Sequence, residues 1–218
     1  MRSLVTQTPF FLDKLDEANL RARGVGTRGE YLERYESLLR PFTQREKARV
    51  SHMCELAKNR CRAAGMLHLL DVNWRFVKCD DRLENGYPHT VGTIVVLPEH
   101  TLRYGDERMV GLIVHEITHV HQRAYPDFAG RQVRALGFEP VRRWESHRES
   151  LRANPDTNNM LYALERVECN PVLHRDARSL AEVSLCPSTG YPGLEHVKNP
   201  EHPFEILAEL NAFAATKA

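Results

Sequence analysis

The sequence predicts an α+β fold, because its secondary-structure signals come in the order helices, strands, helices. Helical periodicity dominates residues 32–64 and returns after residue 106, whereas residues 74–97 are rich in β-branched and aromatic side chains. The length of 218 residues suits one domain of this class. A hydrophobic fraction of 42% and a charged fraction of 27% are typical of a globular protein.

The N-terminal part of the chain is expected to be helical. Apolar side chains recur at helical spacing from Leu32 until Pro41 ends the run. Thr43 is expected to cap a second helix, because Glu46 follows three residues later and completes a capping box. Gly65 marks the expected end of that helix.

Two strands are expected in the middle of the chain. Residues 74–77 are typical of a short strand, and the dipeptide Asn85-Gly86 is a strong turn signal. Residues 90–97 are β-branched and apolar and stop at Pro98, so they are expected to form a second strand.

The C-terminal half is expected to be helical at both ends and irregular between them. The further helices expected are residues 106–125, 128–136 and 203–215. Residues 140–200 are interrupted by prolines and predict only short helical runs near 160–168 and 177–183. A long irregular stretch in a compact domain often has a function.

Charge and hydropathy exclude several classes of protein. Thirty Lys and Arg against 29 Asp and Glu give a net charge of +1, so binding of nucleic acid through bulk charge is not expected. No segment approaches the ~20 consecutive apolar residues that a membrane span needs. The first residues lack the apolar core of a secretory signal. The sequence does not predict an oligomeric state.

The cysteines indicate a reducing environment. Their number, five, is odd, and no two form a C-x-x-C pair. We therefore expect free thiols in a cytoplasmic or other reducing compartment, with Cys54 and Cys61 buried in the structure.

The segment His115-Glu116-Ile117-Thr118-His119 is the strongest functional signal. On a helix, His115 and His119 lie on one face, one turn apart, and can bind one metal ion. Glu116 is then placed to act as general base on a water at that ion, and zinc suits such ligands. The alternative is an ordinary pair of histidines on an amphipathic helix.

A catalytic zinc site needs a third protein ligand. Glu205 is the first candidate, because a carboxylate on a helix is held more firmly than one in a loop. Glu209 would share its face and could orient a ligating histidine. Glu139 and His147 are the other candidates, although Pro140 directly after Glu139 argues against a rigid carboxylate there.

These motifs resemble those of zincin metallopeptidases, and a Glu as third ligand resembles the gluzincin branch. The segment of residues 203–209 is similar to the third-ligand helix of lethal-factor-type peptidases, in which the first Glu binds zinc and the second lies behind it. This resemblance implies that Glu205 is a ligand and that Glu209 supports the site. The segments 121–123 and 154–156 also resemble parts of a group of uncharacterised zincin-like proteins.

The resemblance also implies an architecture. A small antiparallel-edged sheet would lie over the active-site helix, and residues 90–97 would be either its substrate-binding edge strand or a plain core strand. Residues 1–70 match no part of this resemblance, and we expect them to form a helical segment packed on a catalytic domain of residues 71–218, in one compact domain overall. The oxyanion-stabilising tyrosine of the lethal-factor type is replaced by Lys198 here, and the possible substitutes are Tyr191, Tyr162, His196 and His202.

The function expected from these observations is that of a zinc-dependent metallopeptidase with one Zn²⁺ and a peptide or protein substrate. One alternative is a catalytically inactive zincin-like binding module, against which the intact Glu116 argues. The other is a zinc amidase acting on a non-peptide substrate. A deformylase would need an upstream Cys ligand, and the surroundings of Cys79 do not match one.

Overall fold

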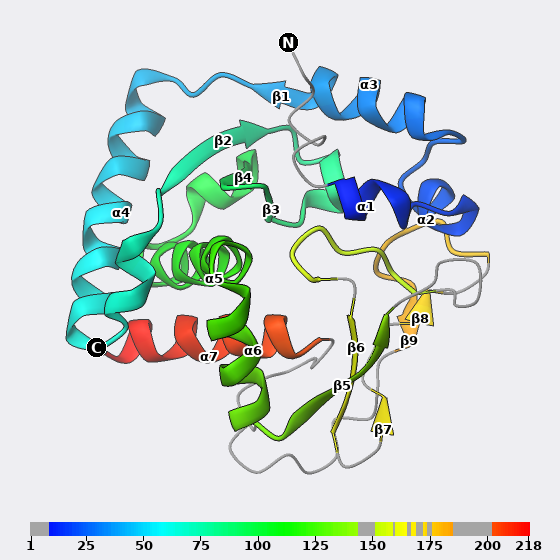
Figure 1. Cartoon of the computed structure of the whole chain (residues 1–218). Coiled ribbons are helices and arrows are strands. Elements are labelled where there is room, and N and C mark those ends of the chain that lie inside the picture. Colours follow the sequence, from blue (N-terminus) through cyan, green and yellow to red (C-terminus); the bar gives the residue numbers. More distant parts are fainter. Residues whose placement is uncertain are drawn as a thin grey trace.

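The computed structural model describes residues 9–143, 151–158, 160–164, 167–168, 172–173, 176–184 and 202–218. It confirms an α+β class in which the sheets are small (Figure 1). In the described residues the helices are α1 (Pro9–Asp13), α2 (Glu17–Ala22), α3 (Arg28–Leu38), α4 (Gln44–Ala63), α5 (Asp106–Ala124), α6 (Pro126–Ala135) and α7 (Pro203–Lys217). The strands are β1 (Leu39–Arg40), β2 (Arg75–Cys79), β3 (His89–Val91), β4 (Ile94–Pro98), β5 (Phe138–Arg143), β6 (Met160–Leu164), β7 (Val167–Glu168), β8 (Val172–Leu173) and β9 (Val183–Ser184).

The main sheet lies on one side of α5, with strand order β1-β2-β4-β3 (Figure 1). The central strands β2 and β4 are parallel, and each outer strand is antiparallel to its neighbour. The prediction of a single strand over residues 90–97 is wrong, because the chain reverses at Gly92 and Thr93 to form the β3–β4 hairpin. Gly92 has φ of 59°, a conformation that glycine adopts without steric cost.

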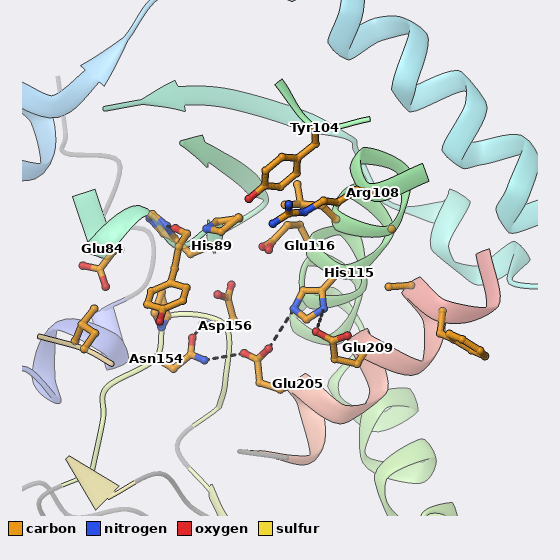
Figure 2. Close-up of a pocket in the computed structure, with 18 of the residues that line it drawn as sticks. Glu84, His89, Tyr104, Arg108, His115, Glu116, Asn154, Asp156, Glu205 and Glu209 are labelled. Carbon is orange, nitrogen blue, oxygen red and sulfur yellow. Dashed lines mark hydrogen bonds and ion pairs between the residues drawn. The ribbon is translucent and has the colours of Figure 1, made fainter. Parts of the chain in front are cut away.

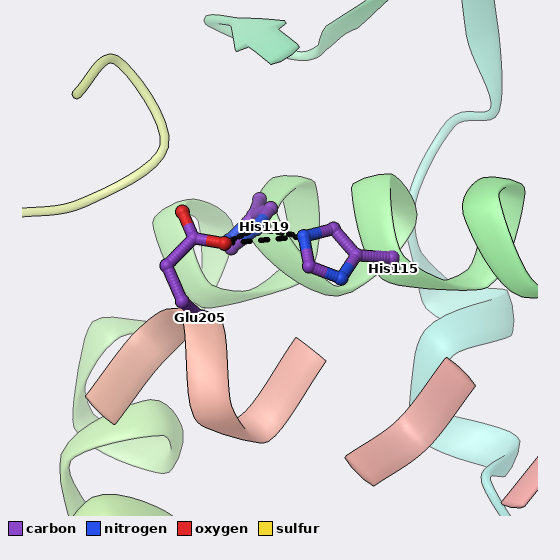
Figure 3. Close-up of side chains that lie close together, drawn as sticks. All are labelled: His115, His119 and Glu205. Atoms are coloured by element: carbon purple, nitrogen blue, oxygen red, sulfur yellow. Dashed lines mark hydrogen bonds and ion pairs between the residues drawn. The ribbon is translucent and has the colours of Figure 1, made fainter. Parts of the chain in front are cut away.

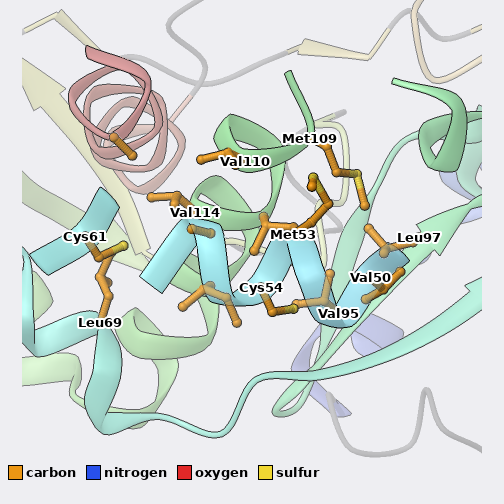
Figure 4. Close-up of a cluster of buried hydrophobic side chains, with 14 of the residues drawn as sticks. Val50, Met53, Cys54, Cys61, Leu69, Val95, Leu97, Met109, Val110 and Val114 are labelled. Atoms are coloured by element: carbon orange, nitrogen blue, oxygen red, sulfur yellow. The ribbon is translucent and has the colours of Figure 1, made fainter. Parts of the chain in front are cut away.

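The largest apolar core lies between α4, the sheet and α5 (Figure 4). Thr43 and Glu46 form the predicted capping box at the start of α4. Met53 of α4 and Met109 of α5 are fully buried there, and burial of such a side chain contributes roughly 1.5–3 kcal/mol. Helix α4 therefore belongs to the same core as the helix that carries the candidate metal ligands.

The cysteines of the described residues agree with the expectation of free thiols. Cys54 and Cys61 are buried in this core, and Cys79 is buried on β2. Cys169 and Cys186 lie outside the described residues.

The N-terminal helices α1 to α3 pack around a second cluster that includes Tyr31 and Tyr35. Arg23, just after α2, forms a buried ion pair with Glu84, and the Tyr31 hydroxyl donates to the same carboxylate. Glu84 has φ of 45°, a conformation that costs a non-glycine residue energy and needs support from its surroundings. The ion pair supplies that support.

Helices α5 and α7 lie side by side (Figure 1). A Cβ atom at Gly111 of α5 would lie 3.2 Å from the Thr216 side chain of α7, so a small residue is needed at this crossing. The observed α7 confirms the helix predicted at residues 203–215. No described helix has both the length and the apolar character required to cross a membrane.

The short helical runs predicted near residues 160–168 and 177–183 are wrong. The first is β6 and β7, which extend an antiparallel sheet from β5. The second consists of turns and the start of β9. Leu and Ala favour helices in isolation, but pairing with the neighbouring strand β5 overrides that preference in β6.

Candidate metal centre

Helices α5 and α7 bring the two histidines and Glu205 together. Ile113 and Ile117 of α5 are fully buried in the core, and His115 and His119 lie on the side that meets α7 (Figure 3). Glu205 lies in the first turn of α7 and points toward both imidazoles (Figure 3). This arrangement is the His115, His119 and Glu205 cluster anticipated from the motif.

The three donor atoms form a nearly equilateral triangle. The Nε2 atoms of His115 and His119 are 3.1 Å apart, and they lie 3.2 and 3.3 Å from Oε2 of Glu205. Ligand atoms about 2.0–2.1 Å from a tetrahedral zinc ion lie about 3.3–3.4 Å from one another. The donor set therefore fits one face of a zinc tetrahedron and leaves the fourth position for water or substrate.

Each imidazole has a polar partner at its Nδ1 atom, a hydrogen bond for His119 and a longer ion-pair contact for His115. The amide nitrogen of Gln122 donates to the carbonyl of Phe204, so its Oε1 accepts from Nδ1 of His119, 2.9 Å away. Nδ1 of His119 therefore carries a proton, and Nε2 is the nitrogen that faces the centre and would give up its own proton when an ion binds. Nδ1 of His115 lies 3.5 Å from the Glu209 carboxylate, as expected for a group that supports the site.

The electrostatics of the cluster favour positive charge at its centre. Burial raises the pKa of Glu205, but the charge of His119 and the hydrogen bonds of both histidines lower it by more, to well below its ordinary value. Burial likewise lowers the pKa of His119, yet the carboxylates of Glu205, Asp156 and Glu116 together raise it by more, to about 10. A buried group of donors with this bias is suited to a divalent cation.

Glu116 is the buried carboxylate beside the cluster. It is 3% exposed, and its Oε2 has no hydrogen-bond partner among the described residues. Burial raises its pKa and the nearby Asp156 carboxylate adds to this effect, so that the pKa is about 8 despite the lowering effect of His115 and His119. A buried polar atom without a partner is costly, so a water or a substrate group at Glu116 would be stabilising.

A cavity of about 740 Å³ opens beside the cluster (Figure 2). Its walls come from α5, α7, the segment before β3 and residues 152–156, and they include His115, Glu116 and Glu205. Cavities of roughly 300–1,000 Å³ are the usual size of ligand sites.

No family model matches this chain, and neither a curated protein nor a solved structure with significant similarity was found. Function must therefore be inferred from the site itself.

The other candidate third ligands do not join the cluster in the described part of the chain. Glu139 lies exposed on β5, opposite Ala163 of β6. The cluster of potential metal donors contains Glu205 and not Glu139. His147 lies outside the described residues.

Of the predicted oxyanion stabilisers, the two that lie in the described residues do not line the cavity. The hydroxyl of Tyr162 accepts a hydrogen bond from Asn158. His202 caps α7, where its Nδ1 accepts from the Phe204 backbone and its Nε2 donates to the Met160 carbonyl. Burial lowers the pKa of His202 to about 3. Tyr191 and His196 lie outside the described residues.

The predicted substrate-binding edge strand is wrong in part. Strand β4 is enclosed between β2 and β3, so of the two strands in this hairpin only β3 lies at an edge of the sheet. The backbone N–H of Thr90 on β3 already donates to Asp156, 2.6 Å away, and Arg123 donates to the Gly92 carbonyl. A peptide cannot pair with these backbone groups while the two contacts hold.

Three polar residues at the site had no role assigned from the sequence. Gln122 orients His119, Asn154 donates to Oε1 of Glu205, and Asp156 lies near Glu116. Their only signal was the partial resemblance of segments 121–123 and 154–156 to zincin-like proteins. Spacing alone could not have placed Asn154, which is 51 residues from Glu205.

Proposed function

We propose that this chain is a zinc-dependent metallopeptidase of zincin-like architecture. The observation that carries the proposal is the donor triangle of His115, His119 and Glu205, with sides of 3.1–3.3 Å, beside a buried and unpaired Glu116 oxygen. Two imidazoles and one carboxylate with an open position are typical of catalytic zinc sites. The sheet over α5 also agrees with the zincin resemblance.

Each residue has a distinct part in the proposed reaction. His115, His119 and Glu205 would hold the ion, which supplies Lewis acidity when bound. Glu116 would accept a proton from the attacking water and transfer it to the amine that leaves when the peptide bond breaks.

Metal analysis tests the site directly. Protein purified without added metal is expected to contain near one zinc per chain, and Glu205→Ala is expected to lose it. Glu139→Ala is the matched control, because it removes an exposed carboxylate outside the cluster. Zinc retained in Glu205→Ala would contradict this ligand assignment, and no zinc in the wild type after reconstitution would contradict the site.

A peptide-library cleavage assay tests the activity. Glu116→Gln is expected to keep zinc and to lose turnover by roughly 10²- to 10⁴-fold, the usual contribution of a general base. Full activity in this variant would contradict the role of Glu116. A wild-type protein that binds zinc but cleaves no peptide would contradict the peptidase proposal.

A further inference from the structure

Residues 151–158 form a loop that reaches the metal cluster from outside α5 and α7. Asn154 of this loop donates from Nδ2 to Oε1 of Glu205 at 2.7 Å (Figure 2). This is the carboxylate oxygen that does not belong to the donor triangle. Asn154 therefore fixes the direction in which Glu205 presents Oε2 to the two histidines.

The orientation of the Asn154 amide is itself fixed. Its Oδ1 accepts from the backbone N–H of Asp156 at 2.8 Å, so its Nδ2 must face Glu205. The Asp156 carboxylate in turn accepts from the backbone and the hydroxyl of Thr90, both at 2.6 Å. The loop is thus held to the sheet on one side and to the metal ligand on the other.

The N-terminal helices hold the start of the same loop. Asn19 of α2 is fully buried and bonds the loop backbone twice, donating to the Leu151 carbonyl at 2.9 Å and accepting from Ala153 N–H at 2.8 Å. The Arg23 guanidinium donates to the Ala153 carbonyl at 2.7 Å. A continuous set of hydrogen bonds therefore runs from α2 through the loop to Glu205.

We propose that Asn154 is a positioning residue for the metal site, and that the N-terminal helices act on metal affinity through it. The inference rests on the metal site of the proposed function. With Oε1 occupied by Asn154, Glu205 would offer only Oε2 to an ion, and a coordination position would remain open for water or substrate. Groups that orient ligands in this way commonly contribute 10–100-fold to metal affinity.

Zinc titration against a competing chelator tests the role of Asn154. Asn154→Ala and Asn154→Asp, which both remove the donor, are expected to bind zinc roughly 10–100-fold more weakly. Asn158→Ala is the matched control in the same loop, because its side chain bonds Tyr162 and the Met160 backbone instead. Its zinc affinity is expected to stay within about threefold of the wild type.

Cobalt(II) absorption gives a readout that a general loss of stability would not produce. The visible spectrum of bound cobalt reports ligand number and geometry, so Asn154→Ala is expected to change it while Asn158→Ala leaves it unchanged. Wild-type zinc affinity and an unchanged cobalt spectrum in Asn154→Ala would overturn the inference. If this variant binds zinc more weakly but the wild type cleaves no peptide, the role of Asn154 is supported and only the peptidase proposal is overturned.

The link to the N-terminal helices is tested by a double-mutant cycle. Asn19→Ala is expected to weaken zinc binding severalfold in the wild-type background and to have no further effect in Asn154→Ala. Asn19→Asp, which keeps the acceptor for Ala153 N–H, gives a second variant if the alanine variant does not fold. Equal effects of the Asn19 change in both backgrounds would show that the helices do not act through Asn154.

Discussion

Arg23→Met is expected to destabilise the protein strongly, although the residue lies outside the candidate metal cluster. The side chains of Arg23 and Glu84 are each 3% exposed and form contacts of 2.9 and 3.1 Å. Methionine has a similar length but no charge, so it leaves the Glu84 carboxylate buried without its cation. Breaking a buried ion pair in this way costs about 3–5 kcal/mol.

Urea denaturation at pH 7, followed by tryptophan fluorescence, measures this cost in the metal-free protein. Glu84→Gln and the double variant Arg23→Met/Glu84→Gln complete a cycle. The double variant is expected to be more stable than the sum of the single changes predicts, by about 2–3 kcal/mol, because neither charge is left unpaired. Arg82→Met is the control, since the Arg82 side chain is 68% exposed and its pair with Asp80 contributes about 0–1 kcal/mol.

The pH dependence gives the same reasoning a second test. Burial raises the pKa of Glu84, but Arg23, together with His89 and the Tyr31 hydroxyl, lowers it by more, so the net pKa lies below 4.5. The stability that Glu84 contributes is therefore present above about pH 4.5 and is lost as the pH falls through the folded-state pKa. A loss below about 1 kcal/mol in Arg23→Met at pH 7, or a coupling near zero, would refute the argument.

Three further predictions concern the metal and its surroundings. Free zinc at 1,000 times its dissociation constant is expected to add about 4 kcal/mol to the unfolding free energy; equal denaturation midpoints with zinc and with EDTA would contradict a specific site. The pKa of His202 is lowered to about 3 in the folded state. This group should therefore reduce the unfolding free energy by about 1.4 kcal/mol for each pH unit as the pH decreases below 6.5. His202→Asn keeps an acceptor for the helix cap and should remove this pH dependence, measured by denaturation at several pH values. The same pH dependence in the variant and the wild type would contradict the role of His202. Gln122→Met should weaken zinc binding roughly 10–100-fold by calorimetry, since His119 loses its orienting acceptor; unchanged affinity would argue that the backbone alone orients the ring.

The elements predicted well from the sequence are those with local signals. The capping box of Thr43 and Glu46 and the apolar stripe before Pro126 depend on residues three or four apart, and both helices are observed. The box of Thr27 and Glu30 carries the same local signal and begins α3, whereas the prediction of a helical N-terminal segment did not separate α1 and α2. Strand β6 could not be predicted in this way, because its conformation depends on pairing with β5.

The residues of the candidate site show the same difference between local and long-range signals. His115 and His119 share a helix face by their spacing alone, and Glu205 is placed by a second helix with its own clear pattern. The partners that orient them come from other segments, and nothing local in the sequence pairs Asn154 with Glu205 or Asp156 with Thr90. Only the fold determines which polar side chains meet there.

The hydrogen bonds that link α2 to the loop and the loop to Glu205 would, under our proposal, couple metal affinity to the docking of the N-terminal helices. Thermodynamic linkage makes this effect reciprocal. If docking of the helices strengthens zinc binding, bound zinc stabilises the docked helices by the same free energy. A tenfold effect on affinity corresponds to about 1.4 kcal/mol in each direction. Because Asn19 and Arg23 bond the backbone at Leu151 and Ala153, the docked helices fix the loop before any ion binds. Under the proposed metal site, the N-terminal helices would therefore act as part of the metal centre and not as a separate module.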